Sequence, residues 1–136
     1  TTLDTWPVDY KTARESLAIQ GGDMLAAALP AWVNEEITAT DQDHSQATFT
    51  KLVKKAHAEL LPIDTPREKY LKVIAFTDWP RAFFFHVVDN KGLRVIVNDA
   101  TYDGASDTFT PITVTPAGRK PMPFESFENG FGKAQV

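Results

Sequence analysis

Residues 70–97 read YLKVIAFTDWPRAFFFHVVDNKGLRVIV, and this stretch decides the fold. Two apolar runs flank the turn residues Asp89-Asn90-Lys91-Gly92, a pattern typical of an antiparallel β-hairpin. Asn90-Lys91-Gly92 suits a three-residue loop in which Gly92 takes the left-handed conformation, so Asp89 is predicted opposite Leu93. Because side chains alternate along a strand, this register decides which residues share each face of the hairpin.

The predicted register gives the hairpin one apolar face and one mixed face. The apolar face consists of Phe83, Phe85, Val87, Leu93, Val95 and Val97. The mixed face consists of Phe84, His86, Val88, Arg94, Ile96 and Asn98. The first face requires a covering layer of helices, whereas the second is too apolar for solvent and too polar for a core. The C-terminal tail with its Phe residues, a protein partner or a small ligand would each account for the mixed face.

The chain outside the hairpin divides into a helical half and a sheet half. Helical spacing of apolar residues covers 9–20, 23–38 and 45–60, interrupted by Gly21-Gly22 and Pro30. Strand patterns cover 69–77, 82–88, 93–98 and 108–115. The sequence therefore predicts one α+β domain over 1–136, with N-terminal helices (1–66) packed on one face of a four-stranded antiparallel meander (67–116), and an irregular tail (117–136). This arrangement resembles cystatin-like and NTF2-like rolls, a likeness of fold that implies no function.

Composition and charge are typical of a soluble globular domain. Hydrophobic residues make up 43% of the chain, charged residues 24%, and the net charge is −4. This acidic balance argues against nucleic acid as a partner, because binding to phosphates requires a clustered basic surface. A local basic zone does occur, and it is interpreted as a solvated helix face and linker. It contains Lys51, Lys54, Lys55, Arg67, Lys69 and Lys72.

The sequence excludes several kinds of site and leaves the compartment open. The chain has no cysteine, which excludes disulfides and thiolate catalysis. No apolar run approaches the ~20 residues that a membrane span requires. The chain opens at Thr1 without Met and shows no signal peptide, so a mature exported protein and an excised soluble domain are both compatible with it.

Catalytic and cofactor patterns are weak. His44, His57 and His86 lie in different predicted elements, and no pair has the spacing of helical metal ligands. Asp99 and Asp103 would make a carboxylate pair, but Asp, Asn and Gly in this loop are also what a turn requires. We therefore predict no catalytic residue, no metal and no cofactor.

These observations favour a non-enzymatic protein-binding module of the adaptor, immunity or inhibitor type, whose partner is another protein and not a nucleic acid. The predicted binding residues are Trp79, Phe84, His86, Arg94 and Asn98. Trp79 is included because a solvated turn between two strands requires no tryptophan, so its ring either folds back onto a core edge or projects as an anchor for a partner. Two alternatives are a small-ligand enzyme of the roll type, with His86 in a pocket between sheet and helices, and a domain cut from a larger assembly.

Overall fold

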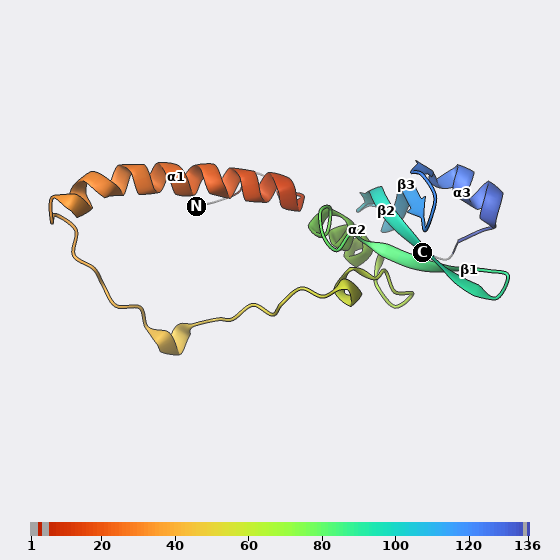
Figure 1. Cartoon of the computed structure of the whole chain (residues 1–136), viewed down its shortest axis with the longest axis horizontal. Coiled ribbons are helices and arrows are strands. Elements are labelled where there is room, and N and C mark those ends of the chain that lie inside the picture. Colours follow the sequence, from red (N-terminus) through yellow and green to blue (C-terminus); the bar gives the residue numbers. More distant parts are fainter. Residues whose placement is uncertain (1–2, 4–5, 135) are drawn as a thin grey trace.

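The computed structural model describes residues 3, 6–134 and 136. Within this part, the chain forms three α-helices, two short 3-10 helices (η) and a four-stranded antiparallel sheet, which confirms the predicted α+β class (Figure 1). The elements in chain order are α1 (Tyr10–Val33), η1 (His44–Gln46), η2 (Lys55–Ala58), α2 (Pro66–Ala75), β1 (Phe83–Val88), β2 (Lys91–Asp103), β3 (Thr108–Pro116), β4 (Met122–Pro123) and α3 (Phe124–Phe131). The strands are ordered β1-β2-β3-β4, so each one pairs with its neighbour in sequence.

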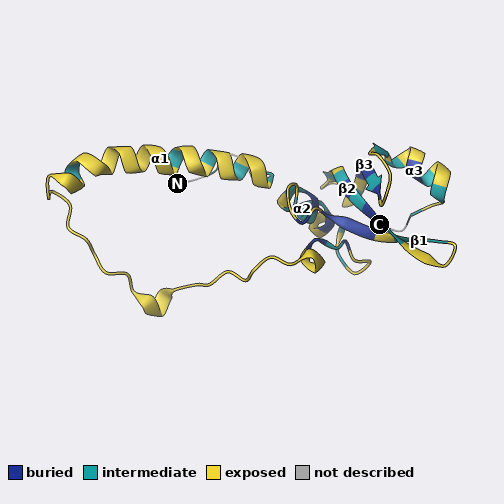
Figure 2. Ribbon diagram, viewed as in Figure 1, coloured by how far each residue is buried: buried dark blue, intermediate teal, exposed yellow. Residues whose placement is uncertain are grey.

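The long helix α1 lies to one side of the sheet (Figure 1). Its N-terminus is capped by Asp9, whose carboxylate accepts a hydrogen bond of 3.1 Å from the Thr12 N–H. The helix continues through Gly21-Gly22 and Pro30, so the interruption predicted at the glycines does not occur. All 24 residues of α1 are described and none of them is buried, as the yellow ribbon in Figure 2 shows. The N-terminal helix α1 therefore does not join the core, and the helix that does, α2, lies largely in the range predicted as a strand.

Two predicted elements before β1 differ from the structure. The predicted strand over 69–77 is wrong, because Thr65 caps a helix there. The Thr65 Oγ1 accepts from the Glu68 N–H at 3.2 Å, and the Glu68 carboxylate accepts from the Thr65 N–H at 2.8 Å. This reciprocal capping box, with Pro66 in the first turn, nucleates α2. The predicted helix over 45–60 is also wrong, because this segment forms η1 and η2 and is otherwise irregular and largely exposed.

The core lies on one face of the sheet. Its members come from the segment before α2, from α2, from the residue before β1, from β1 to β3 and from α3, namely Leu60, Val73, Ala82, Phe84, Val95, Val97, Ala100, Val114 and Phe127. Both α2 and α3 supply a buried side chain to this cluster, Val73 and Phe127 respectively. The predicted irregular tail thus contains β4 and α3, and Phe127 is completely buried. In the described part of the chain, no helix has the length and apolar character needed to cross a membrane.

Candidate nucleic-acid interface

The turn between β1 and β2 sets the geometry of the candidate site. Asp89 and Asn90 have φ values of 50° and 61°, and Val88 pairs directly with Lys91. These two left-handed residues make a two-residue hairpin turn, which suits Asp and Asn because they tolerate positive φ. The predicted three-residue loop is therefore wrong. Gly92 is a strand residue opposite Val87 and does not close the turn.

The observed turn shifts β1 by three residues relative to the predicted register, and because this number is odd, every β1 side chain changes face. Phe84 lies opposite Val95, and His86 lies opposite Leu93, so both face the core side. Phe85 lies opposite Arg94 and is 53% exposed, whereas Phe84 is 2% exposed. The prediction therefore assigned the β2 residues to the correct faces and the β1 residues to the wrong ones. The mixed face predicted for Phe84, His86 and Arg94 together does not exist.

The side of the sheet opposite the core carries an aromatic and cationic surface, which we call the arginine face. It consists of Arg81, Phe85, Arg94, Ile96, Asn98 and Thr115, which surround the buried ring of Phe83. The Arg94 guanidinium carbon lies 4.1 Å from the centre of the Phe83 ring, and Phe83 meets Phe85 edge to face at 5.6 Å. This cation–π contact holds the half-buried Arg94 side chain against the sheet while Phe85 stays exposed.

A chain of side-chain hydrogen bonds places a second arginine on this face. The Arg81 guanidinium donates to the Asn98 side-chain oxygen, and the Asn98 amide donates to Thr115 Oγ1 at 2.8 Å. Asn98 therefore positions Arg81 across β2. Sequence reasoning included Arg94 and Asn98 but missed Arg81 and Phe85, because neither the turn length nor the partner of Asn98 was visible from local spacing.

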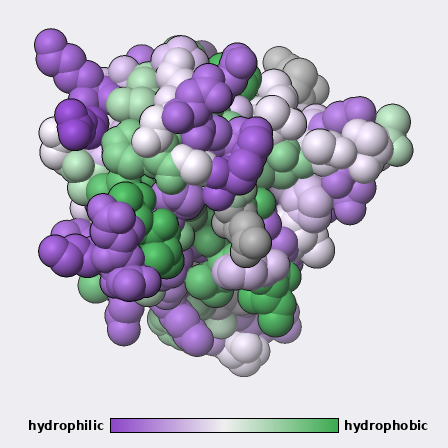
Figure 3. Space-filling model, turned by 90° about the vertical axis from the view of Figure 1, so that its right-hand side faces the viewer, coloured by the Kyte–Doolittle hydropathy of each residue, from purple (hydrophilic) through white to green (hydrophobic). Residues whose placement is uncertain are grey.

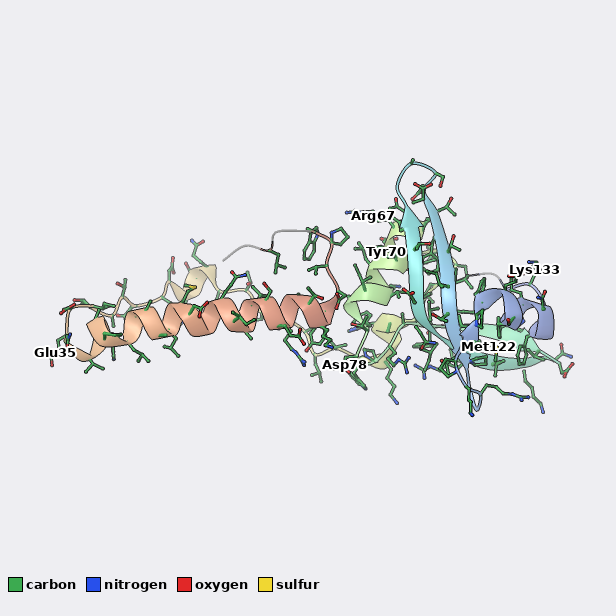
Figure 4. All side chains as sticks on the ribbon, turned by 90° about the horizontal axis from the view of Figure 1, so that it is seen from above. Glu35, Arg67, Tyr70, Asp78, Met122 and Lys133 are labelled. Atoms are coloured by element: carbon green, nitrogen blue, oxygen red, sulfur yellow. The ribbon has the colours of Figure 1, made fainter. Side chains whose placement is uncertain are left out.

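Trp79 lines a different surface. It is 59% exposed and follows α2, where it borders a hollow of about 290 Å³. The other lining residues are Tyr10, Val53, Ala75, Phe76 and Asp78. Figure 4 shows Asp78 at one end of α2 and Arg67 at the other end, beside the long β2–β3 hairpin. Arg94, which was predicted to bind the same partner as Trp79, does not line this hollow.

His86 is held by the C-terminal helix. Its Nε2 donates to the Phe131 carbonyl oxygen at 2.8 Å, and its ring meets the Phe127 ring edge to face at 5.3 Å. The Phe84 ring also meets the Phe127 ring edge to face, with 6.2 Å between the ring centres. Of the three explanations for a mixed face, folding of the tail therefore accounts for Phe84 and His86. His86 also borders a hollow of about 340 Å³ with Pro62, Phe85, Val87 and Lys133.

The carboxylates near β2 form turn contacts. Asp103 accepts hydrogen bonds from Ser106 Oγ at 2.7 Å and from the Ala105 N–H at 2.9 Å, and these bonds lower the pKa of Asp103. The Tyr102 hydroxyl donates to Asp107 at 2.8 Å, which raises the pKa of Tyr102. Asp103 therefore makes turn contacts, but Asp99 lies within β2 opposite Thr113, so the predicted turn between Asp99 and Asp103 is wrong and the turn follows at 104–107. Among the described residues, no group of three potential metal ligands comes together.

The charges are unevenly distributed along the chain. Residues 1–50 contain 2 Lys and Arg against 8 Asp and Glu, whereas residues 51–136 contain 12 against 10. The predicted basic zone is divided by the fold. Lys69 is buried and Lys72 pairs with Asp64, while Lys54, Lys55 and Arg67 remain exposed. The cations available to a partner therefore lie in the part of the chain that contains the sheet.

Comparisons with known proteins show what this chain is similar to. No protein-family model matches the chain. The chain is 33% identical, over 141 aligned positions, to the methionyl-tRNA formyltransferase of Streptococcus pyogenes serotype M49 (strain NZ131). It is 32% identical to the proteins of the same name from serotypes M1 and M4 (strain MGAS10750). Each alignment covers 90% of this chain and 44% of the relative, so the chain spans less than half of the relatives' length.

These relatives contradict the predicted function. They are named as enzymes, so the non-enzymatic adaptor, immunity or inhibitor module is wrong. Their name includes a tRNA, which contradicts the prediction of a protein partner and no nucleic acid. The physical reason for the error is that net charge is a sum over the whole chain. The acidic excess lies in residues 1–50 and conceals the excess of cations in residues 51–136.

Proposed function

We propose that this chain is part of a formyltransferase that acts on methionyl-tRNA, and that its sheet and the arginine face contribute to holding the RNA. The observation that carries the proposal is the 33% identity to a protein of that name over 90% of the chain. An alignment that runs across helices, turns and sheet alike supports a shared role for the whole segment, beyond one local motif.

The arginine face has the chemistry that RNA recognition uses. Guanidinium groups bind phosphates and stack on bases, and exposed aromatic rings stack on unpaired bases. Arg94 is placed by the Phe83 ring and Arg81 by Asn98, while the Phe85 ring is open to solvent beside them. Because contacts within the protein already position both cations, little side-chain entropy is lost when they meet a phosphate.

Further cations extend the positive character beyond the arginine face. Lys54, Lys55 and Arg67 are exposed, and Arg67 lies on α2 beside the β2–β3 hairpin (Figure 4). In this proposal Arg81 and Arg94 contact phosphates, Phe85 stacks on a base, and Asn98 positions Arg81. Trp79 supplies a second exposed aromatic ring near the end of α2.

The experiment measures binding of fluorescently labelled methionyl-tRNA by anisotropy over a salt series. We expect binding to weaken linearly in log Kd against log salt, because phosphate contacts release counterions. Arg94→Ala and Arg81→Ala should each weaken binding and reduce the salt slope by about 1. Arg94→Lys should recover part of the slope, since it restores the charge without the planar group.

Arg14→Ala is the matched control. Arg14 also lies over an aromatic ring, with its guanidinium carbon 5.6 Å from the centre of Tyr10, but it belongs to α1 in the acidic part of the chain. This variant should bind methionyl-tRNA as the wild type does. Absence of tRNA binding by the wild type would overturn the proposal. An equal loss for Arg14→Ala and Arg94→Ala would remove the arginine face from it.

A further inference from the structure

Two turns at one end of the sheet enclose a hollow of about 370 Å³, which we call the turn hollow. Its floor contains Leu93, Pro116 and Phe131, and its rim contains Asp89, Lys91 and Arg119. We propose that the turn hollow holds one unpaired nucleotide of an RNA, with the base on the apolar floor and the phosphate between Lys91 and Arg119. This inference rests on the proposed function and assigns a separate contact for the same ligand.

Backbone hydrogen bonds tie the two turns together. The Ala117 N–H donates to the Arg94 carbonyl at 2.9 Å, which attaches the turn after β3 to strand β2. The Arg119 N–H donates to the Pro116 carbonyl at 3.0 Å, and Gly118 between them has a φ of 74°, which favours glycine. Lys91 begins β2 immediately after the Asp89-Asn90 turn. The two cations therefore stand on turns whose backbones are fixed relative to each other.

The floor of the turn hollow is preorganised by α3. The Phe131 ring stacks on the Phe127 ring at 5.0 Å with 22° between the planes, and Phe127 is completely buried. The Phe131 carbonyl accepts the His86 hydrogen bond, which holds the end of α3 against β1. Pro116 is buried and Leu93 is half-buried. Figure 3 views the molecule from its right-hand side in Figure 1 and shows apolar groups exposed between hydrophilic ones.

The combination of floor and rim selects the ligand class. Two cations favour an anion, while an apolar floor with an aromatic ring favours a flat group with apolar faces, and a nucleotide has both parts. Asp89 on the rim adds a carboxylate that can accept hydrogen bonds from a base amino group. A base in a duplex is stacked and paired, so it cannot enter the hollow. The ligand is therefore an unpaired nucleotide.

The turn hollow and the arginine face can be tested separately. Lys91 and Leu93 alternate with Gly92 and Arg94 along β2, so the two pairs of residues lie on opposite sides of the hairpin. Substitution of Lys91 and Arg119 therefore leaves the contacts of Arg94 with Phe83 and of Arg81 with Asn98 intact.

The experiment uses the full chain and two probes, a short single-stranded RNA oligonucleotide and inorganic phosphate. Binding of the oligonucleotide is measured by anisotropy, and the amide NMR signals of Gly92, Leu93 and Ala117 are followed during titration. We expect the oligonucleotide to shift these signals. The double variant Lys91→Ala with Arg119→Ala should raise the Kd by about tenfold or more, since each cation removed loses a phosphate contact.

The control is Lys11→Ala with Arg14→Ala, which removes the same charge from exposed positions of α1. It should leave the Kd within about twofold. Phe131→Leu keeps an apolar floor but removes the ring, so it should weaken oligonucleotide binding while thermal melting shows an intact fold. Equal Kd values for the hollow variant and the control would overturn this inference and leave the proposed function standing. Shifts with inorganic phosphate equal to those with the oligonucleotide would overturn the nucleotide assignment. A wild type that binds neither tRNA nor the oligonucleotide would overturn both proposals.

Discussion

Val88 pairs directly with Lys91 across the Asp89-Asn90 turn, and this pairing decides which way every aromatic residue of β1 faces. It turns Phe84 into the core beside Phe127 and leaves Phe85 on the arginine face. The core and the candidate interface therefore depend on one short turn. A substitution on the core side of β1 should destabilise the protein strongly, whereas one on the arginine face should destabilise it little.

The first prediction compares neighbouring phenylalanines. Phe84→Ala should lower the free energy of unfolding by about 3–5 kcal/mol, because it removes a buried ring and leaves a cavity. Phe85→Ala should cost less than about 1 kcal/mol, since its ring is 53% exposed. Equilibrium denaturation of the two variants measures both values. Equal costs would contradict the register described above.

The second prediction concerns the turn. Asn90→Val should destabilise the protein by about 1–2 kcal/mol, because a β-branched residue resists the φ of 61° at this position. Gly92→Val should have little effect, since a Cβ at Gly92 would meet only the Phe85 ring, at an ordinary contact distance of 3.7 Å. Thermal melting of the pair distinguishes the two-residue turn from a three-residue loop, in which the effects would be reversed.

The third prediction is a pH dependence at the Asp64–Lys72 pair. Partial burial raises the pKa of Asp64, but hydrogen bonds from Lys72 Nζ and the Leu61 N–H, with the charge of Lys72, outweigh it and lower that pKa overall. The folded pKa then lies below the unfolded value of about 3.9. The stabilisation is complete above the unfolded value and is lost as the pH falls through the folded one.

Asp64→Asn tests this pair because the amide oxygen can still accept from Leu61. At neutral pH the variant should be less stable by about 1 kcal/mol, the scale of one partly exposed charged hydrogen bond. As the pH falls through the folded pKa of Asp64, the difference in stability between wild type and variant should shrink toward zero. A difference that stays constant with pH would show that the charge of Asp64 contributes nothing.

The fourth prediction addresses the start of α2. Thr65→Ala removes the side-chain acceptor for the Glu68 N–H and should cost about 1 kcal/mol. Thr65→Ser keeps the hydroxyl and should stay close to wild type. Chemical denaturation measures both. If the two variants are equally stable, the capping box does not support the helix in solution.

The helix α2 shows how local signals compete. Residues 69–77 have the apolar content of a strand, yet Thr65, Pro66 and Glu68 carry the signature of a capped helix start. The signal was present in the sequence, and the prediction gave more weight to composition than to the cap. The predicted helix over 45–60 shows the converse, because its apolar residues have helical spacing, yet the segment forms only η1 and η2 and stays largely exposed.

The sequence by itself determined the α+β class, three of the strands and the faces of the β2 residues, because alternation and β-branched residues act locally. Only the tertiary structure decided the faces of β1, the place of the tail and the candidate interface. One residue more or less in a turn moves every side chain of the paired strand to the other face of the sheet. Uncertainty about the length of one turn therefore becomes uncertainty about the whole strand. His86 meets Phe131 and Arg81 meets Asn98 across 45 and 17 residues, respectively, and such contacts depend on how the whole chain packs. A surface for RNA is built from cations far apart in the sequence, which only the folded chain brings together.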